Sequence, residues 1–312
     1  MIIYSLEGII GCGNIKWDSN DMPDQTGKIA IVTGSNTGTG YHIAHGLASK
    51  GAQVIMACRS IKRAELAKLN IISELPDSKI TTEILDLADL ASIYEFSKII
   101  KGKYKKIDIL INNAGVMVPP KSNTKDGFEL QFGTNHIGHF VLTGELLPLL
   151  EESGSARIIT MSSIAHNSGK IDFNDLNSEK KRYSRWGAYS QSKLANLIFA
   201  LELDRRLKSR KSSIVSLGSH PGWSATDLQR HSLIFRFLNK FFGMSAKKGA
   251  APSLYAATVK DAIKYPYWGV TKNGEMHGWT GRAKINSKAK DLEVAERLWN
   301  ISCELSGIEY LN

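Results

Sequence analysis

Short apolar runs alternate with helix-like segments from residue 28 to residue 222, and this rhythm limits the fold more than any other feature of the sequence. The runs are rich in β-branched residues, as expected of strands that are buried on both faces. The predicted strands are 28–33, 53–58, 79–87, 106–113, 156–163 and 213–222. Helices between successive strands favour a parallel sheet that is covered on both sides. We therefore predict a doubly wound α/β fold.

No change of composition divides the chain, so we predict a single domain over residues 28–312. Residues 1–27 are predicted to be an N-terminal extension, because they lack the basic start and the cleavage site of a signal peptide. The rhythm breaks over about 223–250, and the tail after about 270 has only a weak pattern. No apolar run approaches the roughly 18 residues that a membrane span needs.

The composition argues against several kinds of site. The cysteines, Cys12, Cys58 and Cys303, are too few and too far apart for a disulfide framework or a zinc site. They fit a reducing compartment, and we expect a cytoplasmic protein. The formal net charge is +10, but lysine and arginine are spread along the chain without a nucleic-acid recognition module. We predict no metal and no nucleic-acid partner, and we expect an anionic ligand to use part of the charge.

The first predicted strand runs into a glycine-rich turn, TGSNTGTG, at residues 33–40. Gly34 lets the chain leave the strand sharply, Gly38 lets the backbone approach a pyrophosphate, and Gly40 lets the next helix pack close to the sheet. The first N–H groups of that helix then favour phosphate. A purely structural turn is the alternative. A cofactor-binding turn would also use the residues between the glycines, which are Ser35, Asn36, Thr37 and Thr39.

The spacing of these glycines resembles the TGxxxGxG signature of the short-chain dehydrogenases/reductases, a family with a Rossmann-type fold and a nicotinamide cofactor. An NAD enzyme would place Asp or Glu at the end of the second strand to bind the ribose 2′-hydroxyl. This chain has Arg59 and Ser60 there, and a guanidinium suits a 2′-phosphate. We therefore predict NADP(H) in preference to NAD(H), with a solvated surface arginine as the alternative interpretation.

Two segments carry candidate acid–base groups. Tyr189 and Lys193 lie four residues apart in a helix pattern, so both project from one face, although such pairs are also common on solvated helices. An ammonium beside a phenol favours phenolate and lowers the tyrosine pKa from its usual value near 10. Ser162 and Ser163 end the fifth predicted strand, where a hydroxyl can bind a substrate carbonyl. The family resemblance selects Ser163 as the catalytic serine.

The resemblance implies further site residues. Asn135 matches an asparagine that holds a water for a proton relay through the lysine. The implied cofactor contacts outside the glycine turn and Arg59–Ser60 are Asp86, Leu87, Asn113, Ala114, Gly115, Tyr189, Lys193, Pro221, Gly222 and Thr226. The segment RYSRWGAYSQSKLAN is similar to the retinol dehydrogenase branch, from which the doubled Lys180–Lys181 and Thr39 depart. Vertebrate members often carry an N-terminal membrane anchor, and none is recognisable here, which argues against a retinoid substrate.

Taken together, these residues predict an enzyme that transfers a hydride between NADP(H) and a small-molecule carbonyl or alcohol. A non-catalytic NADP(H)-binding sensor or scaffold on the same fold is the alternative function. Large apolar residues within 231–249 predict a lid over a lipophilic substrate, as part of the variable region at about 223–250. Helix packing, or weak peripheral contact of its basic residues with a membrane, are the alternatives for that stretch. The resemblance also allows a homodimer through the tyrosine-bearing helix and its neighbour, which the variable region at about 223–250 could block.

Overall fold

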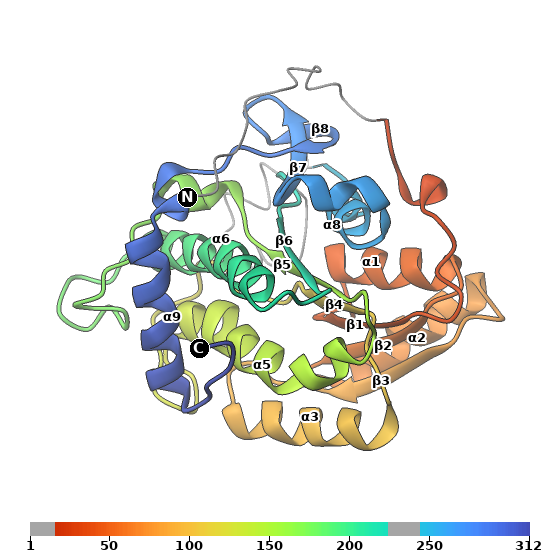
Figure 1. The fold of residues 1–312 in the computed structure, drawn as a ribbon, viewed down its shortest axis with the longest axis horizontal. Helices are drawn as coiled ribbons and strands as arrows, with labels where there is room; N and C mark the ends of the chain where they lie inside the picture. Colours follow the sequence, from red (N-terminus) through yellow and green to blue (C-terminus); the bar gives the residue numbers. More distant parts are fainter. Residues whose placement is uncertain (1–15, 224–243) are drawn as a thin grey trace.

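The computed structural model describes residues 16–223 and 244–312, and it shows one α/β domain around a central sheet (Figure 1). The strands are β1 (Ile29–Thr33), β2 (Gln53–Cys58), β3 (Ile80–Ile84), β4 (Ile109–Asn112), β5 (Arg157–Met161), β6 (Val215–Ser219), β7 (Tyr267–Lys272) and β8 (His277–Arg282). They form one eight-stranded sheet in the order β3-β2-β1-β4-β5-β6-β7-β8. Every neighbouring pair is parallel except β7 and β8, which are antiparallel.

Helices cover both faces of this sheet. They are α1 (Gly38–Ser49), α2 (Ile61–Glu74), α3 (Leu90–Lys103), α4 (Leu130–Phe132), α5 (Gly138–Glu151), α6 (Arg185–Ser209), α8 (Ala246–Thr258) and α9 (Leu292–Ser306). One apolar core joins α1, α2 and α8 to the sheet, and a second joins α3, α5, α6 and α9 to it. Ile31 belongs to one core and Val32 to the other, because successive side chains of a strand point to opposite faces.

The strands predicted from the sequence are all present, each within its predicted bounds, so the doubly wound fold is confirmed. The weakly patterned end of the chain adds the β7–β8 hairpin and α9. β7 pairs in parallel with β6, and β8 then turns back along β7. The expected lid region at about 223–250 ends inside α8, whose Ala250 is fully buried in the core. Residues 224–243 lie outside the described part of the chain, so the lid over 231–249 stays a prediction.

The helical stretch between β4 and β5 is interrupted. Its first turn, α4, passes into a π-helical turn at Gly133–Ile137, and only then does α5 begin. Such wide turns inside helices are frequent at functional sites. Asn135 lies within this turn and is fully buried. The π turn therefore places a predicted site residue in an irregular part of the helix.

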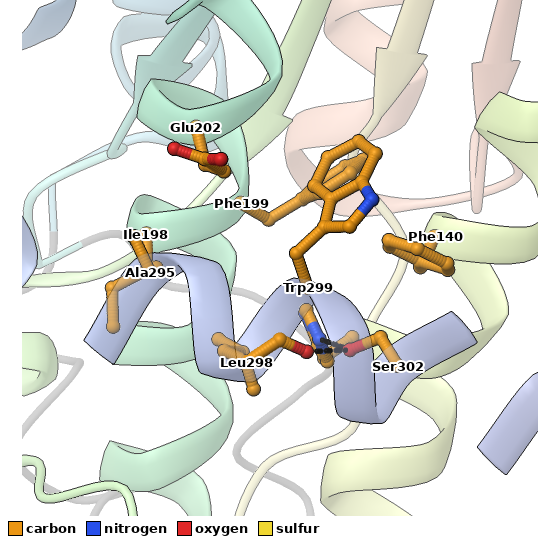
Figure 2. A pocket seen from close by; sticks show the side chains of 9 residues that line it. Phe140, Ile198, Phe199, Glu202, Ala295, Leu298, Trp299 and Ser302 are labelled. Atoms are coloured by element: carbon orange, nitrogen blue, oxygen red, sulfur yellow. Dashed lines mark hydrogen bonds between the residues drawn. The ribbon is translucent and has the colours of Figure 1, made fainter. Parts of the chain in front are cut away.

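α9 packs on the outer side of α5 and α6. Figure 2 shows Trp299 of α9 reaching toward Phe140 of α5 and Phe199 of α6, with ring centroids 5.1 and 6.0 Å away. Below it, the hydroxyl of Ser302 meets Nε2 of His136 at 2.9 Å. The narrow gap among these side chains leaves no room for a water molecule. This part of the molecule is packed interior rather than a ligand pocket.

Sheet order locates the crevice where a ligand binds. β2 and β3 lie on one side of β1, whereas β4, β5 and β6 lie on the other. The chain therefore changes direction between β1 and β4, and the loops at the carboxyl ends of these strands separate to leave an opening. Within the described residues, no helix is both long enough and apolar enough to cross a membrane.

Candidate active site

A cavity of about 690 Å³ opens at the carboxyl ends of the parallel strands. Most of the site residues predicted from the sequence line it. These are Gly34, Asn36, Thr37, Gly38, Thr39, Gly40, Arg59, Ser60, Asp86, Leu87, Asn113, Ala114, Gly115, Ser163, Tyr189, Lys193, Pro221 and Gly222. Ser35 and Asn135 lie behind its wall, and Thr226 lies outside the described residues. Separate stretches of the chain thus converge on one space, as the sequence predicts.

The glycine turn has the geometry that its sequence requires. Gly34 and Gly38 have φ values of +63° and +57°, a region that favours glycine. A Cβ on Gly40 would collide with the carbonyl oxygen of Gly34 and the amide of Asn113, so the first turn of α1 can approach the sheet only without a side chain. The turn and the start of α1 therefore form a cradle of backbone that fits a pyrophosphate.

Hydrogen bonds fasten the cradle to the neighbouring strand. Thr33 Oγ1 accepts from the backbone N–H groups of Asn113 and Ala114, both at 2.9 Å. The side-chain amide of Asn113 donates to the Thr33 carbonyl at 2.8 Å. Ser35 turns inward, where its hydroxyl donates to the Val32 carbonyl at 2.9 Å. Asn113 and Ser35 therefore shape the cradle. Thr33, which the sequence did not single out, adds a side-chain link between the end of β1 and the loop after β4.

Basic side chains line the cavity at the end of β2. Arg59 and Ser60 follow Cys58, the last residue of β2, and both are exposed. Ser60 caps α2 by accepting a long hydrogen bond, 3.5 Å, from the backbone N–H of Arg63. Arg63 lines the cavity as well and was missed, although the Ser60 cap could have placed it in the first helical turn. A phosphate here would meet two guanidinium groups and a helix N-terminus.

The catalytic candidates meet at the end of β5. Ser163 follows β5 and caps a short 3₁₀ helix, its hydroxyl accepting from the backbone N–H of Ala165 at 3.2 Å. Tyr189 and Lys193 reach the same place from α6 and are only 6% and 4% exposed. Lys193 Nζ donates to the Met161 carbonyl at 3.1 Å and lies 5.9 Å from the centre of the Tyr189 ring. All three residues line the cavity.

Burial shifts the pKa of both helix groups. It lowers the pKa of Lys193 to about 8, because charge is costly in a buried position. It raises the pKa of Tyr189 to about 12, and the neighbouring Ser163 opposes this rise. The sequence argument predicts a lowered tyrosine pKa. Among the groups of the protein itself, burial has the larger effect and the tyrosine pKa moves the other way.

Asn135 supports this centre from behind. Its side-chain oxygen accepts from the backbone N–H of Val116 at 2.8 Å, and its amide donates to the Val116 carbonyl at 3.0 Å and to Ser192 at 2.9 Å. A Cβ on Gly115 would stand 3.0 Å from Asn135 Oδ1 and 3.5 Å from Lys193 Nζ. Gly115 therefore lets the asparagine and the lysine approach the same stretch of backbone.

The rest of the cavity wall is largely apolar, and sequence reasoning did not find it. Its apolar residues include Val116, Met117, Pro119, Leu130, Met161, Ile164, Ala165, Trp186 and Trp223. The indole of Trp186 meets the Tyr189 ring edge to face, with centroids 5.9 Å apart. Within the described residues, no cluster of three or more His, Cys, Asp or Glu side chains could hold a metal ion.

Comparison with known proteins places this site in a family. The profile of the short chain dehydrogenase family matches residues 28–233, which is more than half of the chain. The protein belongs to that family and is therefore an oxidoreductase of the carbonyl–alcohol type. Within the family it lies in the retinol dehydrogenase-like branch. It is 42% identical to mouse retinol dehydrogenase 12 over 288 residues, covering 91% of this chain and 88% of the relative.

Other relatives support the same placement. Human retinol dehydrogenase 13 is 41% identical over 292 residues, covering 91% of this chain and 86% of that protein. A solved structure of an uncharacterized protein from Mycobacterium paratuberculosis is 38% identical, with a TM-score of 0.80 over 95% of this chain and 99% of that one. The Pseudomonas aeruginosa RhlG/NADP complex is 22% identical, with a TM-score of 0.63 over 78% and 94% of the two chains, and shares the fold.

Proposed function

We propose that this protein is an NADP(H)-dependent enzyme that interconverts an aldehyde or ketone and an alcohol on a lipophilic small molecule. The observation that carries the proposal is that Ser163, Tyr189 and Lys193, beside β5, line the same cavity as the glycine turn after β1 and Arg59 after β2. The backbone cradle made by Gly34 and Gly40 fits the pyrophosphate of a dinucleotide.

The chemistry follows from what each side chain can do. When bound, the nicotinamide ring supplies the hydride for reduction or takes it up in oxidation. The Ser163 hydroxyl donates a hydrogen bond to the substrate oxygen and opposes the build-up of charge there. The Tyr189 phenol gives that oxygen its proton. Lys193 remains beside the phenolate that is left, held by the Met161 carbonyl. Because the pKa of Tyr189 is raised to about 12, the phenol carries its proton at neutral pH.

The preference for NADP(H) rests on charge at the end of β2. Arg59 and Arg63 both line the cavity there, and Arg59 stands where an NAD enzyme has a carboxylate. Two guanidinium groups favour the 2′-phosphate that distinguishes the two cofactors. The lipophilic substrate class rests on the apolar wall near Tyr189. The Trp186 indole meets the Tyr189 ring with centroids 5.9 Å apart, and Trp223 follows β6, the neighbour of β5.

A carbonyl panel tests the proposal directly. Aldehydes and ketones of increasing apolar size, all-trans-retinal among them, are supplied with NADPH or NADH, and cofactor consumption is followed. We expect turnover with NADPH, and a loss of about 10²- to 10⁴-fold in Tyr189→Phe, the range for a missing general acid. Tyr94→Phe, which alters a tyrosine that is 39% exposed, is the matched control and should keep full activity. NADPH binding without turnover on any carbonyl would instead favour a sensor or scaffold protein.

A further inference from the structure

A buried histidine–carboxylate pair lies behind the part of the wall that follows β6. His220 Nε2 is 3.3 Å from Glu275 Oε2, and the two side chains are 0% and 13% exposed. The other ring nitrogen of His220, Nδ1, accepts a hydrogen bond from the backbone N–H of Gly222 at 3.2 Å. This bond assigns the proton of a neutral imidazole to Nε2, the atom that faces the carboxylate. His220 therefore connects Glu275 to the backbone of residue 222.

Glu275 is fixed on its own side as well. It lies in the turn between β7 and β8, where Asn273, Gly274 and Glu275 have φ values of 50°, 65° and 65°. Its Oε1 accepts from the backbone N–H of Lys284 at 2.7 Å. Burial alone would raise the pKa of Glu275, but His220 and the Lys284 N–H outweigh burial and hold that pKa below its usual value. The carboxylate is therefore a charged anchor within the hairpin.

The same hairpin holds the cavity wall formed by Pro221, Gly222 and Trp223. The backbone N–H of Trp223 donates to the Met276 carbonyl at 2.8 Å. Gly222 has a φ of +66°, and a Cβ there would stand 2.7 Å from the same carbonyl oxygen. The wall thus leaves β6 and immediately leans on the turn that carries Glu275. Its position depends on a part of the chain that is remote in sequence.

Sheet order tells which end of the cavity this wall faces. β6 is the neighbour of β5, after which Ser163 lies, whereas β2 and Arg59 lie beyond β1 and β4 on the other side. The wall at 221–223 therefore borders the reactive end, where the proposed nicotinamide ring lies, and not the 2′-phosphate end. Glu275 and His220 stand behind this wall and are not among the residues that line the cavity.

We propose that His220 and Glu275 form a positioning pair that holds the 221–223 wall in place for the nicotinamide half of the cofactor. The inference rests on the proposed function, because it needs a cofactor whose reactive half lies beside β6. The pair acts through Gly222 and Trp223, and it touches neither substrate nor cofactor itself. Breaking it loosens the contacts at the nicotinamide end and leaves the adenine end unchanged.

A comparison of whole and half cofactor tests this inference. The dissociation constants of NADPH and of 2′,5′-ADP, which lacks the nicotinamide half, are measured by calorimetry on the full chain. Glu275→Gln keeps the shape of the side chain and removes its charge, and His220→Asn keeps an acceptor near Gly222 while removing Nε2. We expect each to weaken NADPH about tenfold, typical of one lost charge-assisted contact. Binding of 2′,5′-ADP should change less than about twofold.

Two further variants complete the design. The Kd of the double variant for NADPH should equal that of whichever single variant binds NADPH less tightly, because both changes break the same contact. Asp261→Asn removes a carboxylate from an exposed ion pair with Lys264, at 2.8 Å, and should leave both constants unchanged. Unchanged NADPH affinity in Glu275→Gln would overturn the inference, and so would an equal weakening of both ligands. A wild-type protein that binds neither ligand would overturn the proposed function itself.

Discussion

At the scale of single residues, the pKa of Lys193 predicts how activity depends on pH. Burial lowers this pKa to about 8, so the side chain is an ammonium below that pH and a neutral amine above it. Tyr189, with a pKa of about 12, keeps its proton over the same range. For reduction we therefore expect kcat/KM to be steady below pH 8 and to fall as the pH rises through 8, because the ammonium is lost first.

The measurement is a pH profile of NADPH-dependent carbonyl reduction on the wild-type protein and on Lys193→Arg. Arginine stays charged across the range, so any activity that this variant retains should lose the fall near pH 8. A profile that stays flat to pH 10 in the wild-type protein would contradict the role given to the lysine. A stopped-flow assay of NADPH binding at each pH separates the chemical step from cofactor affinity.

Arg59 and Arg63 are expected to decide the preference for NADPH over NADH. Both line the cavity at the end of β2, and each is expected to contact the 2′-phosphate through a charge-assisted hydrogen bond. Replacing either by alanine should raise KM for NADPH about tenfold or more, since such bonds contribute about 1.5–3 kcal/mol. KM for NADH, which lacks the phosphate, should stay the same. Arg182→Ala, at an exposed position outside the cavity, is the matched control.

The residues of the site differ in how far the sequence could predict them. The glycine turn, Arg59 and the Tyr189–Lys193 spacing were predictable because each motif is local, and strand ends gather at one edge of a parallel sheet. Met117 and Trp186 were not, because an apolar residue on a cavity wall has the same local pattern as one in the core. Glu275 was not predictable either, since only the β7–β8 hairpin brings it to His220.

At the scale of elements, the buried strands were the most predictable part, because a continuous apolar run is itself the pattern of a doubly covered strand. The π turn was not predictable. TNHIGHF fits an ordinary helix, and the wide turn coincides with bonds from Asn135 to the distant Val116 backbone. α9 has apolar residues at helical spacing, but nothing in its sequence tells which helix it covers.

Glu129 and Tyr183 fasten the start of α4 to the loop before α6, and breaking their contact should lower stability. Tyr183 donates to Glu129 Oε1 at 2.7 Å, while Phe132 N–H donates to Oε2 at the same distance. Glu129 is fully buried, so Tyr183→Phe leaves one carboxylate oxygen without its donor. We expect a loss of about 1–3 kcal/mol in the free energy of unfolding, measured by denaturant titration. The control is Tyr104→Phe. The Tyr104 hydroxyl lies 3.4 Å from Thr81 Oγ1, and its loss should cost less.

At the scale of the whole molecule, α9 and the end of the chain wrap the helix pair α5 and α6. Tyr310 donates to the Phe140 carbonyl at 3.0 Å, and Arg206 of α6 donates to the Leu311 carbonyl at 3.0 Å. The homodimer expected through the tyrosine-bearing helix stays a prediction. The face of α5 and α6 around Phe140 and Phe199 is already occupied, so a second copy would have to use another face.

Trp299 lies at the centre of these contacts, and replacing it should destabilise the protein. The indole contacts Phe140, Phe199 and Tyr310, and the Arg206 guanidinium lies 4.5 Å from its ring centre. Trp299→Ala should lower the free energy of unfolding by about 3–5 kcal/mol, the usual cost of truncating a buried aromatic.

Two comparison variants separate the indole from the rest of α9. Trp299 Nε1 has no hydrogen-bond partner among the described residues, so Trp299→Phe strands no polar group and should cost clearly less. Leu292→Ala, at a side chain that is 66% exposed, should change stability by less than about 0.5 kcal/mol. Equal losses in all three variants would mean that α9 is not anchored through this indole, and denaturant unfolding followed by circular dichroism distinguishes the outcomes.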